Sequence, residues 1–179
     1  MRVFIALNLP LEVKDYLFLL QSSFKSSNAK INFVAKKNLH QTLKFFGDIN
    51  ETKLETLQEN LSNIHFNKFY VELSSFMVFP NVGLPKVLWV GLEPENTIIN
   101  LQKLIDQFTL TIGKKDTKFG AHLTLGRIKL IKDKDKFFKD ICDVKLKPLR
   151  FPVEKFSLIK SELTKNGPIY SNIQDYYLE

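Results

Sequence analysis

Two short stretches, His40-Gln41-Thr42-Leu43 and His122-Leu123-Thr124-Leu125, repeat one pattern 82 residues apart. Both lie in sequence typical of β-strands. Because side chains alternate across a strand, the histidine and the threonine of each copy share one face, and the final leucine takes the other. Each copy therefore offers an imidazole beside a hydroxyl group. Two copies facing each other would line a cleft with two histidines and two hydroxyl donors.

The sequence around the repeat predicts an α+β chain. Strands are expected over residues 2–7, 31–34, 39–46, 69–79, 87–92, 119–128, 151–163 and 169–173. Pro10 is expected to open a first helix with apolar positions from Val13 to Phe24, and further helices are expected over 51–64, 97–112 and 133–141. Strands outnumber helices without regular β-α-β alternation, so we expect antiparallel sheets with helices packed on one side. No linker rich in Pro, Gly or Ser divides residues 1–179, which are expected to form a single bilobal domain.

Residues typical of helix ends, bulges and turns refine the expected boundaries of these elements. Asn50 is placed to cap the second helix. The polar stretch from Gln21 to Asn28 is expected to end the first helix. A change in the phase of alternation at Ser74-Ser75 predicts a β-bulge. Turns are expected over 80–85 and 165–168, and the latter would close a C-terminal hairpin.

Composition excludes several classes of protein. With 44% hydrophobic and 25% charged residues, the chain is typical of a globular protein and not of a disordered one. The single cysteine, Cys142, excludes an internal disulfide framework and a four-cysteine zinc site. No stretch approaches the ~18 apolar residues of a membrane helix, and the apolar run at the N-terminus is short for a signal peptide. We therefore expect a soluble cytoplasmic protein with no membrane partner.

The net charge of +7 is concentrated in one segment. Between Gly113 and Lys147 there are 11 basic and 5 acidic residues, so this segment carries most of the excess. A basic surface attracts polyanions through phosphate contacts. The alternative is a solvated lysine-rich surface, which is the simpler interpretation of Lys132–Lys139.

The repeated motif suits phosphodiester chemistry. A neutral imidazole can take a proton from water, and an imidazolium can protonate a departing oxygen. Threonine hydroxyls can donate hydrogen bonds to phosphate oxygens as charge builds on them. Neither a metal nor another cofactor is required, and the chain has only three histidines and no His-Glu-x-x-His or Cys-His cluster.

The two motifs resemble those of the 2H phosphoesterases, and they are most similar to the bacterial and archaeal RNA 2′,3′-cyclic phosphodiesterases, historically called 2′-5′ RNA ligases. The resemblance covers nearly the whole chain. It rests on residues 2–7 (RVFIAL), 40–47 (HQTLKFFG), 86–91 (KVLWVG), 119–127 (FGAHLTLGR) and 161–170 (SELTKNGPIY). One departure is Ala121, where the family usually has proline; it affects local rigidity and leaves the chemistry in place.

This resemblance implies a fold and a reaction. The fold would have two pseudo-symmetric lobes, each an antiparallel sheet with helices on its outer side, facing across a central groove. The reaction would be hydrolysis of a terminal 2′,3′-cyclic phosphate to a 2′-phosphomonoester. By the family pattern His40 is the proton donor and His122 the proton acceptor, while Thr42 and Thr124 bind the phosphate.

Four further residues are candidates for substrate binding. Arg127 matches a basic position of the family, but by strict alternation it reaches the groove only if Gly126 breaks the strand or the strand ends there. Lys44 and Phe46 share the face of the first histidine, so we expect Lys44 to meet the RNA backbone and Phe46 to stack on a base. Phe45 is the phenylalanine that the family shares.

Other interpretations stay open at this stage. The activity can be 2′-5′ ligation, although no phosphate-binding loop for a nucleoside triphosphate is present to drive synthesis. The substrate can be another cyclic nucleotide or a 2′-5′-linked oligonucleotide, or the chain can be a non-catalytic RNA-binding module. We expect the partner to be RNA with a 2′,3′-cyclic phosphate end, or a related nucleotide, and the protein to be a monomer. His65 is expected to be structural, and Trp89 is expected to lie in the core.

Overall fold

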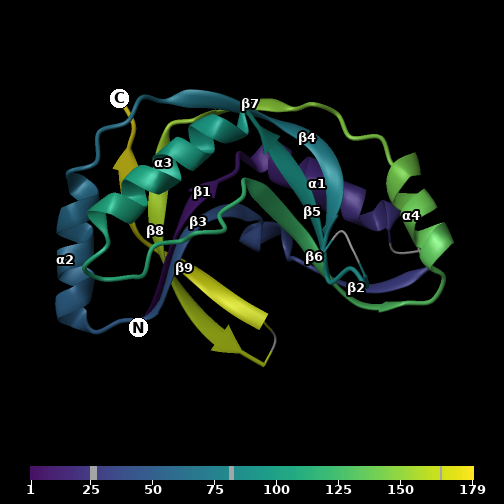
Figure 1. Ribbon diagram of the computed structural model, residues 1–179, viewed down its shortest axis with the longest axis horizontal. Coiled ribbons are helices and arrows are strands. Elements are labelled where there is room, and N and C mark those ends of the chain that lie inside the picture. Colours follow the sequence, from purple (N-terminus) through teal and green to yellow (C-terminus); the bar gives the residue numbers. More distant parts are fainter. Residues whose placement is uncertain (25–27, 81–82, 166) are drawn as a thin grey trace.

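The computed structural model describes residues 1–24, 28–80, 83–165 and 167–179 (Figure 1). The helices are α1 (Leu11–Ser23), α2 (Glu51–Ser62), α3 (Glu95–Phe108) and α4 (Lys134–Asp143), with a 3-10 turn η1 (Lys36–Asn38). The strands are β1 (Arg2–Asn8), β2 (Ala29–Phe33), β3 (His40–Asp48), β4 (Phe69–Phe79), β5 (Val87–Glu93), β6 (His122–Ile131), β7 (Arg150–Val153), β8 (Lys155–Thr164) and β9 (Gly167–Tyr177). Parts of the polar stretch at 21–28 and of both expected turns, residues 25–27, 81–82 and 166, lie outside the described residues.

The strands form two antiparallel sheets, which confirms the expected fold class. The first sheet has the order β3-β1-β8-β9, and the second has the order β2-β6-β5-β4-β7. In Figure 1, α2 and α3 accompany the first sheet, while α1 and α4 accompany the second. A side-chain contact fixes α1 there, because the Gln21 amide donates to the carbonyl oxygens of Val34 (2.8 Å) and Leu125 (3.3 Å).

The two halves of the chain exchange elements. The first half places β1 and β3 in the first sheet but sends β4 to the second. The second half places β5 and β6 in the second sheet and returns β8 to the first. The triplets β3-β1-β8 and β6-β5-β4 therefore correspond to each other, and this correspondence brings the two motif-bearing strands, β3 and β6, against one another. The pseudo-twofold arrangement positions both motifs at one place.

Local sequence signals explain most element boundaries. Asn50 caps α2 as expected, since its Oδ1 accepts a hydrogen bond of 2.9 Å from the backbone N–H of Lys53. The bulge predicted at Ser74-Ser75 is confirmed, because both residues lie between the pairs that Leu73 and Phe76 make with β5. The Asp133 carboxylate caps α4 in the same way, accepting from the N–H of Lys136 at 3.0 Å.

The prediction of one strand over 151–163 is wrong. The segment holds two strands, β7 and β8, which pair in different sheets, and Glu154 lies between them. A continuous run of strand-forming residues carries no local signal for a change of sheet, which is decided by tertiary packing.

The helices are short. Among the described residues, none is long and apolar enough to cross a membrane.

Candidate active site

A groove of about 590 Å³ lies where β3 and β6 face each other, and it contains both motifs. Its lining includes His40 and Thr42 from the first sheet and His122 and Thr124 from the second. The structure therefore brings together the four residues on which the sequence interpretation rests.

The two histidines are held in the same way. Nδ1–H of His40 donates to the carbonyl oxygen of Asn38 at 2.6 Å, and Nδ1–H of His122 donates to that of Gly120 at 2.8 Å. In both cases the acceptor lies two residues earlier in the chain. A carbonyl at Nδ1 places the proton of the neutral ring there, so Nε2 of each ring is left to accept or deliver a proton. At His40 the Nε2 atom lies 2.9 Å from the Thr42 hydroxyl, which can donate to it.

The environments of the two rings differ. His122 is exposed, whereas His40 is partly buried against Phe4 and Tyr170, with ring centroids 5.0 and 5.4 Å away. Burial lowers the pKa of His40 below its ordinary value, the hydrogen bond to Asn38 opposes this, and the charge of Lys14 adds to the lowering. In the free protein His40 therefore favours its neutral form.

We expect an NMR titration of the free protein to give His40 a midpoint below the ordinary ~6.5. Burial disfavours the imidazolium, so the ring loses its proton at a lower pH than a solvated histidine does. Adding inorganic phosphate should move the midpoint upward, because an adjacent anion favours the charged ring. A midpoint at or above the ordinary value in the free protein would contradict this description of the site.

A β-bulge follows the threonine in both motifs. On β3, Thr42 pairs with Ala6 and Lys44 with Ile5, which leaves Leu43 without a partner on β1. On β6, Leu125 is left without a partner on β5 in the same way. Each bulge reverses the alternation, so the fifth residue after each histidine, Phe45 or Arg127, turns toward the groove.

These bulges correct three expectations. Arg127 does line the groove, although the strand neither breaks at Gly126 nor ends there. Lys44 does not share the face of His40: it is 2% exposed and points away from the groove. Phe46 is also turned away, because the alternation that the bulge resets places Phe45 in the groove and the next residue on the opposite face. It packs against the core, with the Lys44 ammonium 5.4 Å from its ring centroid.

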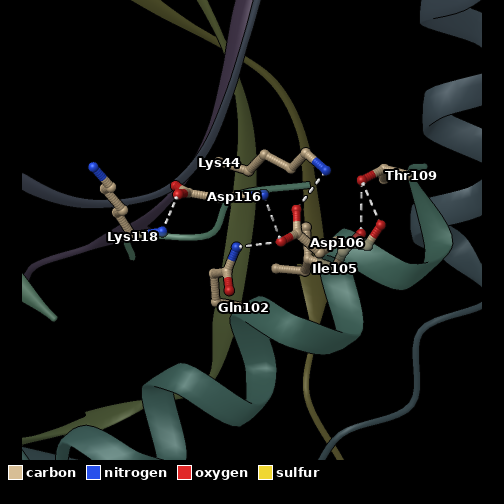
Figure 2. A network of polar contacts seen from close by, with 7 residues as sticks. All are labelled: Lys44, Gln102, Ile105, Asp106, Thr109, Asp116 and Lys118. Carbon is tan, nitrogen blue, oxygen red and sulfur yellow. Dashed lines mark hydrogen bonds and ion pairs between the residues drawn. The ribbon is translucent and has the colours of Figure 1, made fainter. Parts of the chain in front are cut away.

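Lys44 belongs instead to a buried polar network (Figure 2). Its ammonium donates to Asp106 Oδ1 on α3 at 2.5 Å, and both side chains are almost completely buried. Asp106 Oδ2 accepts from the Gln102 amide at 2.9 Å and from the backbone N–H of Asp116 at 3.0 Å. The network thus joins β3, which carries the first motif, through α3 to the segment that precedes the second motif. Sequence reasoning missed it, because Lys44 and Asp106 are far apart in the chain.

A cluster of aromatic side chains lies beside His40, and the sequence analysis did not predict it. Phe4 on β1 stacks on Phe45, with ring centroids 5.8 Å apart and planes 13° apart. Tyr170 on β9 meets Phe4 edge to face, and the Arg2 guanidinium carbon lies 5.2 Å from the Phe45 centroid. Phe45 is nevertheless 52% exposed, so part of its side chain remains accessible from the groove.

Two other residues are placed differently with respect to the groove. Trp89 was expected in the core, but it is only partly buried, and its ring centroid lies 5.4 Å from that of His122. It stands in an unbroken apolar run, which gives no indication of which face each side chain takes. His65 lies apart from the groove, where its Nδ1 contacts a Glu179 carboxylate oxygen at 2.5 Å.

The groove attracts anions. Arg2, Lys37 and Arg127 line it, and none of its described lining residues is Asp or Glu. Within the described parts of the chain, no three His, Cys, Asp or Glu side chains cluster as a metal site would require. A second cavity, of about 620 Å³, lies beside α3 and the segment 115–119, but its lining includes neither motif histidine. We therefore assign the candidate active site to the groove.

Comparison with known proteins agrees with this geometry. The family model described as "LigT like Phosphoesterase" matches residues 7–89 and again residues 90–170. The chain belongs to the LigT-like phosphoesterase family. The resemblance inferred from the motifs is thus confirmed, and the chain is an enzyme of the phosphoesterase type. The double match follows the internal repeat of the fold, with one motif in each half.

Individual members of the family resemble the chain over its whole length. A protein of Methanocaldococcus jannaschii named RNA 2′,3′-cyclic phosphodiesterase is 36% identical over 98% of this chain and 100% of its own. One of the same name from Methanothermobacter thermautotrophicus is 33% identical, with 99% and 98% covered. A crystal structure from Thermus thermophilus superposes with a TM-score of 0.79 at 26% identity, covering 99% of this chain and 97% of the other.

Proposed function

We propose that the protein hydrolyses the terminal 2′,3′-cyclic phosphate of RNA to a 2′-phosphomonoester, using His122 as general base and His40 as general acid. One observation carries the proposal: two histidines, each tied through Nδ1 to a backbone carbonyl, meet in one cationic groove with a threonine beside each. The relatives named RNA 2′,3′-cyclic phosphodiesterase support the substrate.

The reaction needs one proton to be taken and one to be given. Nε2 of His122 removes a proton from water as the water oxygen attacks phosphorus. The bond from phosphorus to the 3′ oxygen breaks, and Nε2–H of His40 protonates that oxygen. The phosphate stays on the 2′ oxygen. Return to the starting state requires His122 to lose a proton and His40 to gain one.

The lowered pKa of His40 fits this role once substrate is bound. The phosphodiester brings a negative charge to the ring, and an opposite charge raises the pKa of an imidazole. His40 therefore becomes a proton donor in the complex, next to the oxygen that needs the proton. Thr42 releases Nε2 of His40 and turns its hydroxyl to a phosphate oxygen.

Other groove residues bind the substrate. Thr42 and Thr124 donate to the two non-bridging oxygens as charge builds on them. Arg127 adds a cationic fork suited to phosphate. The exposed ring of Phe45 offers a stacking surface for the terminal base. Lys44 and Phe46, which are turned away from the groove, have no part in this proposal.

We expect hydrolysis to persist in excess chelator, because two imidazoles take over the water activation and charge stabilisation that a metal would supply. The measurement follows loss of the cyclic phosphate from a short RNA incubated with metal-stripped protein, in the absence of nucleoside triphosphate. Joining of RNA ends under these conditions would favour the ligase alternative. Loss of activity in chelator with recovery on adding a divalent ion would contradict the two-histidine mechanism.

The remaining expectations are part of this proposal. RNA is the partner, the protein acts as a monomer in the cytoplasm, and residues 1–179 form one bilobal domain.

A further inference from the structure

The second sheet has an open face that continues from the active site. Its strands pair in rows: Thr124 on β6 lies opposite Trp89 on β5, and Trp89 lies opposite Met77 on β4. In the next row Arg127 lies opposite Val87, and Val87 lies opposite Phe79. Since residues opposite one another in a sheet share a face, Trp89, Met77, Val87 and Phe79 lie on the face of Thr124 and Arg127. We call these four residues the apolar platform.

Two large apolar side chains of the platform are exposed to solvent, and Trp89 and Val87 are only partly buried. Phe79 is 65% exposed and Met77 is 41% exposed, while the intervening residues of these strands turn to the opposite face, where Leu88 and Val90 join the core. Large apolar side chains that adjoin one another on a sheet and remain in contact with solvent are typical of binding surfaces.

The platform begins at a catalytic side chain. The ring centroid of Trp89 lies 5.4 Å from that of His122, with the planes 66° apart. The strands β2, β6 and β5 are neighbours in the second sheet, and they carry Asn32 of the groove, His122 and Trp89 in that order. A chain whose terminal phosphate lies at His122 can therefore leave the groove directly over the indole ring.

The charges beside the platform favour a polyanion. Arg127 and the exposed Lys129 lie on β6 at the end of the sheet that holds Val87 and Phe79, so two cations flank the platform there. The acidic pair Glu72 and Glu93 lies at the other end of β4 and β5. A second copy of this chain, with its net charge of +7, would bring like charges together here.

We propose that the apolar platform binds the single-stranded RNA that precedes the terminal cyclic phosphate, with a base stacked on Trp89 and the next nucleotides lying over Met77 and Phe79. Single-stranded nucleic acids are held in this way, by aromatic stacking beside a cationic track for the phosphates. The inference rests on the proposed function and extends it: the substrate is a polynucleotide chain, and a cyclic mononucleotide engages the groove alone.

Trp89 provides a direct readout, because it is the single tryptophan of the sequence. We expect a short oligoribonucleotide ending in a 2′-phosphate to quench the indole fluorescence and to bind more tightly than the matching 2′-phosphorylated mononucleotide. The phosphate end is common to both probes, so the difference reports the platform. Equal affinity and equal quenching for the two probes would overturn the proposal.

Substitution of Phe79 tests the same surface without touching His122. Phe79→Ala should raise KM for an oligoribonucleotide with a cyclic phosphate end by about 5- to 150-fold, the range for loss of one base stack. Hydrolysis of a 2′,3′-cyclic mononucleotide should be unchanged. The matched control is Phe18→Ala: this side chain is 46% exposed on α1, which packs on the other face of the sheet, and neither substrate should be affected.

The outcomes separate this inference from the proposed function. If Phe79→Ala affects both substrates equally, or affects neither, the proposed role of the platform is overturned. The proposed hydrolysis of the cyclic phosphate would stand in either case. A dimer that Phe79→Ala converts to a monomer would identify a second copy as the occupant and would also overturn the proposed role of the platform. If the protein hydrolyses neither substrate, the proposed function fails, and the fluorescence titration still decides whether the platform binds RNA.

Discussion

Replacing His40 by alanine is expected to lower kcat/KM on the natural substrate by ~10²–10⁴-fold and to lower it far less on a substrate whose 3′ oxygen is replaced by sulfur. A thiolate has a conjugate acid with a pKa of ~8.5, by analogy with cysteine, and leaves without a proton donor. A sugar alkoxide is far more basic and needs one. The variant His122→Ala should lose activity on both substrates, because water still lacks its base.

The comparison of two variants on two substrates fixes the roles. Recovery of His122→Ala alone would mean that the acid and the base are assigned in the wrong order. Recovery of neither would remove the case for a dedicated general acid. His65→Ala is the matched control, since this histidine lies outside the groove beside Glu179, and its activity should equal that of the parent protein.

The substitution Asp106→Leu is expected to destabilise the fold by about 3–5 kcal/mol, because it leaves the buried Lys44 ammonium without a counterion. Two further donors, the Gln102 amide and the Asp116 N–H, lose their acceptor as well. For a protein of this size such a loss corresponds to a fall in Tm of about 6–20 °C. Denaturant or thermal unfolding measures it.

The double variant Lys44→Met/Asp106→Leu tests the cause. It should lose less free energy of unfolding than the sum of the single variants, because a buried apolar pair leaves no unpaired charge. Strictly additive losses would contradict a role for the ion pair. Lys160→Met is the control, since its partner Glu162 is exposed and such pairs contribute about 0–1 kcal/mol.

The histidines and threonines of the site could be predicted from the sequence, because the repeated motif sets their relative positions. An H-x-T pattern in a strand places His40 beside Thr42 whatever follows, and the repeat at His122 needs only a fold that brings the two strands together. The sequence also indicated the bulge at Ser74-Ser75, since hydrophobic and polar residues change phase there.

The residues after each motif could not be placed in this way. From Leu43 to Phe46 almost every side chain is large and apolar or carries a long apolar stem, so the alternation has no visible phase for a bulge to interrupt. Strict alternation therefore predicted that Lys44 and Phe46 face the groove and that Arg127 faces away from it, and the bulges reverse all three predictions. The VLWVG run hid the orientation of Trp89 for the same reason.

The exchange of strands between the sheets was also beyond local sequence. Nothing between Phe151 and Leu163 differs in strand propensity on the two sides of Glu154, yet β7 and β8 belong to different sheets. Tertiary pairing makes that choice, and the prediction of one continuous strand over 151–163 was wrong for this reason.

The most direct test of the central claim is the position of the product phosphate. RNA ending in a 2′,3′-cyclic phosphate is incubated with the protein in chelator, the product is digested, and its terminal nucleotide is compared with 2′- and 3′-phosphorylated standards. If His40 protonates the 3′ oxygen as phosphorus accepts water, the terminal nucleotide carries a 2′-phosphate and a free 3′ hydroxyl. A terminal 3′-phosphate, or an unopened ring, would contradict the account.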